Sequence, residues 1–188
     1  MKEQLQKDFD NTIKNLSLSQ KDIEIKKFSL DNFINKGFPN RKEEDWKFSD
    51  LNQIINKNIG ELSFYNDYTS TNKVDTSVFV DGLEHNKIVF INGRIEKIDF
   101  DYEKKGQIEI IDQSETINKF DNNNSLSDLN NAFTNKCFKI VIKTGYQLLK
   151  PLIIYHTTNS KIWSKNINLR LDFELQEDSC LRLIDLFN

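Results

Sequence analysis

One stretch decides how this sequence divides into elements: residues 37–51, which read GFPNRKEEDWKFSDL. Gly37 and Pro39 end any helix that precedes them, because proline lacks an N–H and disfavours helical backbone at the residue before it. Ser49 offers a side-chain oxygen that can cap a new helix from about Asp50 onward. The stretch therefore predicts a turn between two helices.

The residues before and after this turn have the apolar spacing of amphipathic helices. Leu5, Phe9, Ile13 and Leu16 recur at intervals of four, four and three residues, which places them on one face of a first helix. A second helix is expected over residues 21–36 and a third over residues 49–57, so residues 1–65 form a predicted helical region.

Trp46 stands among charged residues within the turn. A side chain of this size gains free energy by packing under neighbouring elements, with its indole N–H hydrogen-bonded. We therefore expect it to be buried between the N-terminal helices and the first strands.

The pattern changes to that of strands after a predicted linker at residues 66–86. Lys87–Ile91 and Arg94–Ile98 flank Asn92-Gly93, the strongest short signal for a β-hairpin. A helical turn is expected over residues 125–133. The remaining predicted strands of the region 87–188 are Gln107–Ile111, Phe138–Ile142, Leu152–Tyr155, Asn166–Glu174 and Cys180–Leu186.

Residues 167–175 alternate strictly between apolar and polar side chains, which predicts one buried and one polar face. Short strands separated by turn signals are typical of a sandwich, a barrel or a β-solenoid. The sequence shows no clear repeat, so the pattern alone leaves these three architectures open.

Composition excludes several classes of function. The net charge of −3 gives no electrostatic basis for binding nucleic acid or an anionic membrane surface. No apolar run reaches the roughly 18 residues of a membrane span. The first twenty residues have no apolar segment typical of a secretory signal, and two cysteines without metal-ligand spacing indicate a reducing cytosol.

The chemically versatile residues are few and scattered. Cys137 and Cys180 each lie in or beside a predicted strand, where a lone cysteine is usually a small buried hydrophobe. His85 and His156 have no second ligand at metal-binding spacing. The charged run at residues 41–45 is expected to be a solvated turn, with contact to a partner subunit as its functional alternative. We therefore predict no catalytic, cofactor-binding or metal-binding residue.

Four stretches resemble the SufB/SufD family of the SUF iron–sulfur cluster assembly system. Residues 37–51 are similar to the family segment GxPTRKEEDWKYTDL, with Asn40, Phe48 and Ser49 as the departures. The later stretches follow in the family's order and at its approximate spacing: Val89–Arg94, Leu129–Phe133, and Ile140–Gly145 with Lys150–Ile154. The absence of cysteine before Cys137 makes the chain more similar to SufD-type members than to those SufB-type members that carry an N-terminal cysteine cluster.

The resemblance implies an α+β fold, with an N-terminal helical region followed by the first turns of a right-handed β-helix. It implies a cytoplasmic, non-enzymatic scaffold that supports cluster assembly and iron acquisition with SufB and SufC homologues. In the family, the residues linked to cluster assembly lie at the junction between SufB and SufD, in a part of the fold beyond the matched region. The resemblance therefore assigns no cluster ligand to this chain. The alternative is a β-solenoid interaction module unrelated to iron–sulfur chemistry.

The chain stops directly after an expected strand, where a solenoid coil would present an unpaired apolar edge. We therefore expect a truncated member of the family, or a short form that covers this edge by forming a homodimer. Self-association is expected through residues 166–188.

Overall fold

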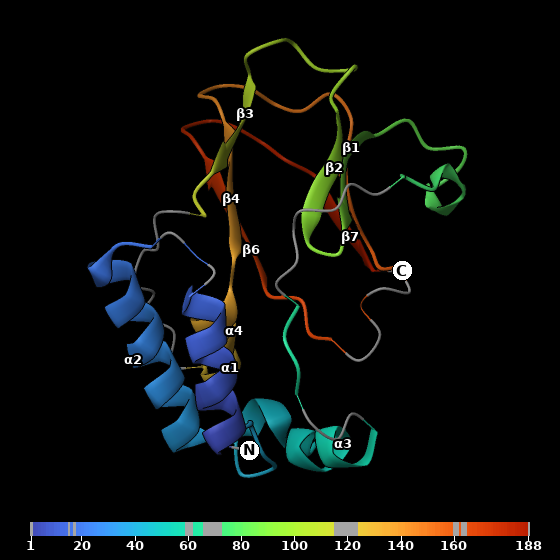
Figure 1. Ribbon diagram of the computed structural model, residues 1–188. Coiled ribbons are helices and arrows are strands. Elements are labelled where there is room, and N and C mark those ends of the chain that lie inside the picture. Colours follow the sequence, from blue (N-terminus) through green and yellow to red (C-terminus); the bar gives the residue numbers. More distant parts are fainter. Residues whose placement is uncertain are drawn as a thin grey trace. The chain divides into compact units, whose positions relative to one another are not determined.

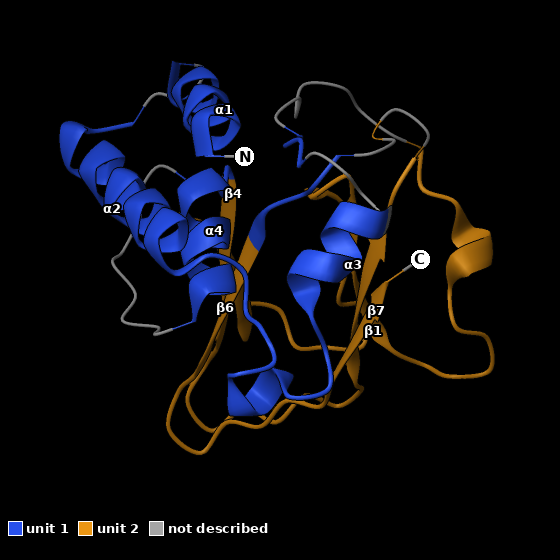
Figure 2. Ribbon diagram, turned by 90° about the horizontal axis from the view of Figure 1, so that it is seen from below, with its two compact units in different colours: residues 1–66, 114–135, 164–169 blue, residues 67–113, 136–163, 170–188 orange. Residues whose placement is uncertain are grey.

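The computed structural model describes residues 2–14, 16, 18–58, 62–65, 73–114, 124–159, 162 and 165–187 (Figure 1). Of the predicted linker at 66–86, residues 66–72 lie outside this part of the chain. The chain forms two compact units, coloured separately in Figure 2. Unit 1 comprises residues 1–66, 114–135 and 164–169, and unit 2 comprises residues 67–113, 136–163 and 170–188.

Unit 1 is mainly helical. Its α-helices are α1 (Lys2–Lys14), α2 (Gln20–Lys36), α3 (Leu51–Asn58) and α4 (Ser125–Phe133), with a 3-10 turn, η1, at Glu44–Trp46. The backbone N–H of Asp22 donates to the hydroxyl of Ser19, which caps α2 at its start. Asn124 caps α4 in the same way, by accepting from the N–H of Leu126.

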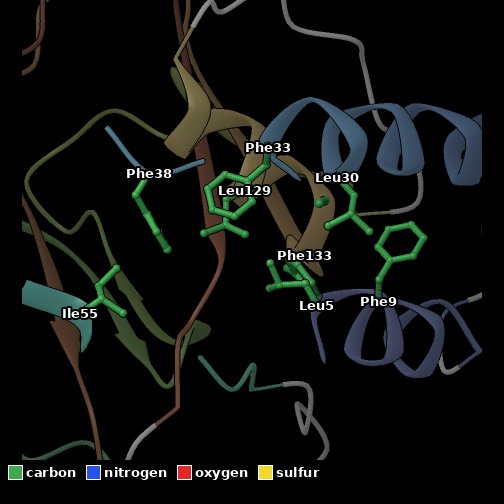
Figure 3. Close-up of a cluster of buried hydrophobic side chains, with 9 residues drawn as sticks. Leu5, Phe9, Leu30, Phe33, Phe38, Ile55, Leu129 and Phe133 are labelled. Carbon is green, nitrogen blue, oxygen red and sulfur yellow. The ribbon is translucent and has the colours of Figure 1, made fainter. Parts of the chain in front are cut away.

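The core of unit 1 is built from the apolar faces of these helices (Figure 3). Phe133 of α4 lies at its centre, edge-on to Phe9 of α1 at 6.2 Å and stacked on Phe64 at 3.6 Å between ring centroids. The buried members of this cluster are Leu5, Phe9, Leu30, Phe33, Phe38, Ile55, Leu129, Ala132 and Phe133. The helical spacing predicted Leu5 and Phe9 correctly as members of the core.

The stretch 37–51 turns as expected but is capped differently. Gly37 has a φ of +74° and its N–H donates to the carbonyl of Phe33, 2.7 Å away, which closes α2. Trp46 is half-buried, and its expected packing between the N-terminal helices and the first strands stays a prediction. The cap of α3 is Asp50 and not Ser49, because the Asp50 carboxylate accepts from the N–H of Gln53 at 3.1 Å.

Unit 2 contains the strands, apart from the first residue of β6. They are β1 (Asn86–Ile91), β2 (Arg94–Asp99), β3 (Ile108–Asp112), β4 (Lys136–Ile142), β5 (Leu152–Thr157), β6 (Leu169–Leu175) and β7 (Leu183–Phe187); a short 3-10 turn, η2, spans Thr76–Val78. The predicted hairpin is present, with positive φ at both Asn92 and Gly93 between β1 and β2. Within the described residues, no helix combines the length and apolarity that a bilayer crossing requires.

The strands form two separate sheets, with the orders β2-β1-β5-β7 and β3-β4-β6. The expected first turns of a right-handed β-helix were therefore a wrong prediction: the protein is a mixed α/β chain with two small sheets and no closed solenoid among the described residues. The physical reason lies in two antiparallel strand pairs. A β-helix stacks its coils by parallel pairing, whereas β1 pairs antiparallel with β2 and β3 antiparallel with β4. Parallel pairing is found between β1 and β5 and between β5 and β7.

The larger sheet is buried on both faces near its centre. On one face Tyr155 of β5 packs with Val89, Ile91 and Ile153. Phe79, from the segment that precedes β1, packs against the same cluster. The other face meets the smaller sheet within unit 2, where the rings of Phe90 and Phe138 lie 5.8 Å apart.

The C-terminal strands depart from the predicted alternation. β6 begins at Leu169 and not at Asn166, and its side chains are half-buried throughout, apart from Leu175, which is 48% exposed. The predicted division of residues 167–175 into one buried and one polar face was therefore wrong. β6 is an edge strand in the order β3-β4-β6, so within this sheet its backbone has a neighbouring strand, β4, on one side.

Candidate functional site

The two cysteines lie in different environments. Cys137 is buried in β4, as expected of a small hydrophobe, and Cys180 is exposed in the segment between β6 and β7. The expectation that Cys180 is a small buried hydrophobe was therefore wrong. Its backbone is nonetheless held, because the N–H of Cys180 donates to the carbonyl of Tyr146 at 3.1 Å.

His85 is buried in a chain of hydrogen bonds on unit 2. The N–H of Val80 donates to the hydroxyl of Tyr155, which lies 2.7 Å from Nε2 of His85. Nδ1 of His85 lies 2.5 Å from the carbonyl oxygen of Leu83. Since a carbonyl can only accept, Nδ1 carries the proton and Nε2 accepts from Tyr155. Both ring nitrogens thus have a hydrogen-bond partner, and this chain of bonds fixes the segment before β1.

His156 forms a second arrangement, on β5. Its Nε2 lies 2.8 Å from Oδ1 of Asp185 on β7. Its ring stacks between Phe90 of β1 and Phe187 of β7, with centroid distances of 5.3 Å and 4.4 Å and interplanar angles of 7° and 8°. We call Phe90, His156 and Phe187 the ring ladder. It crosses three neighbouring strands on one face of the larger sheet.

Spacing along the sequence could not reveal this pair of His156 and Asp185. The two residues are 29 positions apart, and the parallel register of β5 with β7 brings them together. In that register Asp185 lies beside Ile154 and Phe187 beside His156, so the Asp185 carboxylate reaches the His156 ring diagonally on the same face of the sheet. Across the described residues, no group of three or more His, Cys, Asp or Glu is arranged to hold a metal ion.

The charged run at residues 41–45 is exposed, and Lys42 and Glu43 form hydrogen bonds that stabilise the turn. The N–H groups of Asn40 and Lys42 donate to the side chains of Glu43 and Asn40 at 3.2 Å and 3.0 Å. Arg41 lines an open, polar depression on unit 1 with a volume of about 760 Å³, together with residues of α3 that include Lys57. Contact of this run with a partner stays a prediction.

Glu103 is a half-buried residue whose carboxylate sequence reasoning missed. It accepts four hydrogen bonds: from the Asn86 amide and the Tyr146 hydroxyl, both at 2.6 Å, and from the N–H groups of Leu149 and Lys150 at 3.1 Å. Burial alone would raise the pKa of Glu103, but these donors together lower the pKa below its ordinary value. Burial, the hydrogen bond to Glu103 and its charge raise the pKa of Tyr146. The carboxylate pins two loops of unit 2 together.

Among the described residues of unit 2, Phe187 of β7 is the most exposed large apolar side chain. β7 is the last strand in the order β2-β1-β5-β7. Phe187 is 75% exposed, Leu183 43% and Ile184 39%. The Asp185 carboxylate on this strand is bonded to His156.

No protein-family model matches this chain, and no curated protein matches it significantly. The resemblance to the SufB/SufD family therefore rests on the four stretches of sequence described above.

Proposed function

We propose that this chain is a non-catalytic scaffold of the SufB/SufD type, closer to SufD, in SUF iron–sulfur cluster assembly. In this role it acts in the cytoplasm with SufB and SufC homologues and supports cluster assembly and iron acquisition. The observation that carries the proposal is the close similarity of residues 37–51 to the family segment, with three later stretches in the same order. No cluster ligand is assigned to the chain, because the iron–sulfur cluster is the cargo of the assembled complex.

Several residues that match the family are buried in the core or form a turn. This supports the proposal, because a chance match confined to exposed residues would not include them. Phe38, from the first stretch, is buried in the core of unit 1. Asn92 and Gly93 make the hairpin turn with positive φ. Ala132 and Phe133 bury the inner face of α4. A scaffold depends on such positions for a stable frame.

A second candidate is an interaction module without any link to iron–sulfur chemistry. The exposed apolar edge of β7 favours it, because an edge of this kind binds extended chains whatever process they serve.

Native mass spectrometry of the chain co-expressed with SufB and SufC homologues tests the first proposal. We expect a complex that contains the chain and both homologues. Failure to form any complex with either homologue would contradict the scaffold assignment and leave the second candidate.

A charge-reversal variant sharpens this experiment. Glu44 and Asp45 are exposed within the stretch of greatest resemblance, so the double variant Glu44→Lys/Asp45→Lys is expected to weaken the complex. Glu3→Lys, on the exposed side of α1, is the matched control. Equal recovery of the complex with both variants would exclude the charged run as the contact.

A further inference from the structure

Two dipeptides of this chain have the sequence that forms a succinimide with the least obstruction: Asp81-Gly82 and Asn92-Gly93. In each, the amide nitrogen of the glycine can attack the side-chain carbonyl carbon of the residue before it, because glycine has no side chain to hinder the attack. The asparagine is the more reactive of the two in an unfolded chain, because hydroxide is a poor leaving group from a carboxylate. The sequence alone therefore favours reaction at Asn92.

The fold restrains the side chain of Asn92. Its Nδ2 donates to Oδ1 of Asn159 at 3.0 Å, and its Oδ1 accepts from the N–H of Asn159 at 3.1 Å. The N–H of Asn92 also donates to the carbonyl of Thr157 at 3.0 Å. Asn92 is 1% exposed, so its amide group cannot rotate toward the nitrogen of Gly93 while these bonds are in place. Reaction at Asn92 therefore requires local opening of the hairpin turn.

Asp81-Gly82 has the opposite environment. Both residues are exposed in the segment before β1. The N–H of Gly82 donates to Oδ1 of Asp81 at 2.8 Å, so the attacking nitrogen already faces the carboxyl group. Gly82 has a φ of +71°, and a Cβ added to it would meet no atom within 4 Å. The backbone at Gly82 therefore has the space to rotate as the five-membered ring closes.

Another exposed aspartate before a small residue lacks this arrangement. Asp178 precedes Ser179 in the turn after β6, and it also has a positive φ, of 56°. The N–H of Ser179, however, donates to the carbonyl of Gln176 at 3.0 Å. This backbone hydrogen bond directs the nitrogen that would attack away from the carboxylate of Asp178. Asp178 is therefore a suitable internal comparison for Asp81.

We propose that Asp81-Gly82 is a site of spontaneous isoaspartate formation in the folded protein, and that the hydrogen bonds of Asn92 protect Asn92-Gly93 from the same reaction. The nitrogen of Gly82 forms a bond to Cγ of Asp81, one bond from Cγ to oxygen breaks, and one water molecule leaves. Water then opens the succinimide at either carbonyl, which gives aspartate or isoaspartate. The two steps together change no oxidation state. The proposal goes beyond the iron–sulfur assignment and does not depend on it.

The modification lengthens the backbone between two fixed points. In isoaspartate the main chain runs through Cβ and Cγ, which adds one methylene at residue 81. On one side the N–H of Val80 donates to the hydroxyl of Tyr155, and on the other Nε2 of His85 accepts from the same hydroxyl. The loop between Val80 and His85 must therefore rearrange around the added methylene.

The modification also creates a new carboxylate, from the former main-chain carbonyl group of Asp81. Protein isoaspartyl methyltransferases recognise this group. In their reaction an oxygen of the carboxylate attacks the methyl group of S-adenosylmethionine, and S-adenosylhomocysteine leaves. We therefore expect the aged protein, and not the fresh protein, to accept a methyl group from this class of enzyme.

Peptide mapping of the folded protein after prolonged warm incubation in neutral buffer tests the site. Isoaspartate has the mass of aspartate, so electron-transfer fragmentation locates it, and methyl transfer from radiolabelled S-adenosylmethionine measures its amount. We expect isoaspartate at residue 81, a succinimide peptide lighter by one water molecule, and an unchanged Asn92. In the chain unfolded by urea we expect the order to reverse, with Asn92 reacting before Asp81.

Variants of the protein separate the two parts of the proposal. Asp81→Glu keeps the charge but requires a six-membered ring, and is expected to remove the methyl-acceptor signal of the aged protein. Asp178→Glu, at the other exposed aspartate, is the matched control and is expected to leave this signal unchanged. Asn159→Ala removes the acceptor of the Asn92 side chain and is expected to allow deamidation of Asn92 in the folded protein. Circular dichroism establishes that each variant is folded.

Three results would overturn the proposal. One is the absence of isoaspartate at residue 81 in the folded protein after an incubation in which the unfolded chain reacts there. Another is reaction of Asn92 before Asp81 in the folded protein. The last is equal resistance of Asn92 in the wild type and in Asn159→Ala, which would show that these hydrogen bonds do not protect it. Because SufB and SufC are absent from these experiments, their outcome is independent of the scaffold assignment.

Discussion

The ammonium group of Lys26 lies 2.5 Å from the carbonyl oxygen of Thr134, at the C-terminal end of a helix more than a hundred residues away in sequence. The same Nζ lies 3.1 Å from the carbonyl of Asn131 and 3.4 Å from that of Ala132. Lys26 is fully buried. The last carbonyls of a helix lack partners within the helix, and a cation there is also attracted to the partial negative charge at the helix C-terminus. Lys26 therefore ties α2 to the end of α4.

Replacing this lysine should destabilise unit 1. Lys26→Met keeps the length of the side chain but leaves the buried carbonyls without their donor, and we expect a loss of about 1–3 kcal/mol in the free energy of unfolding. Urea denaturation measures the loss. Lys27→Met, at the exposed neighbouring position, is the control and should change stability by less than about 0.5 kcal/mol. Equal stability of the two variants would contradict the capping role.

Phe133 should be the most sensitive aromatic residue of the helical core. It is 1% exposed and contacts the rings of Phe9 and Phe64, so Phe133→Ala is expected to cost about 3–5 kcal/mol. Phe48→Ala, at a side chain that is 91% exposed, should cost less than about 0.5 kcal/mol. Thermal unfolding of both variants checks the difference, and a comparable loss for the two would place Phe133 outside the core.

The Glu103 carboxylate should make part of the stability depend on pH. Its pKa is lower in the folded chain than its ordinary value of 4.5. Its contribution to stability is therefore fully present above this ordinary value and is lost as the pH falls through the lower folded pKa. Glu103→Gln should destabilise the protein by about 1–2 kcal/mol at pH 7, and this difference should shrink below pH 4.

Denaturation at several pH values tests this dependence. Glu84→Gln is the matched control, because the Glu84 carboxylate forms an exposed pair with Lys150 and should contribute less than about 1 kcal/mol. The free energies of unfolding of the wild type and Glu103→Gln are compared from pH 7 to pH 3. A constant difference over this range would show that the ionised carboxylate of Glu103 is not what stabilises the wild type.

The hydroxyl of Tyr155 should be needed to hold the segment before β1. Tyr155→Phe removes the acceptor of the Val80 N–H and the donor to His85, and we expect a loss of about 1–3 kcal/mol. Nitrogen-15 NMR should show the Nδ1–H tautomer of His85 in the wild-type protein. Observation of the Nε2–H tautomer would contradict the direction of the hydrogen-bond chain.

Local patterns in the sequence were sufficient for most of the elements. The spacing of Leu5 and Phe9 predicted α1, and Gly37 marks the end of α2, because the positive φ that closes a helix suits glycine. Asn92-Gly93 predicted the hairpin for the same reason. These features depend on neighbours within a few residues, so the sequence contains their full explanation.

The tertiary structure decided which distant residues meet. The Asp185 carboxylate and the His156 ring become neighbours through the parallel register of two strands, and Lys26 acquires its carbonyl partners through the packing of α2 on α4. The arrangement of the strands in two sheets was decided in the same way, since a strand pattern states which face is apolar and not which strand lies beside it. The sequence by itself determined the elements and the hairpin turn. The pairing of strands, the buried polar contacts and the exposed edge of β7 follow from long-range packing, which no local spacing records.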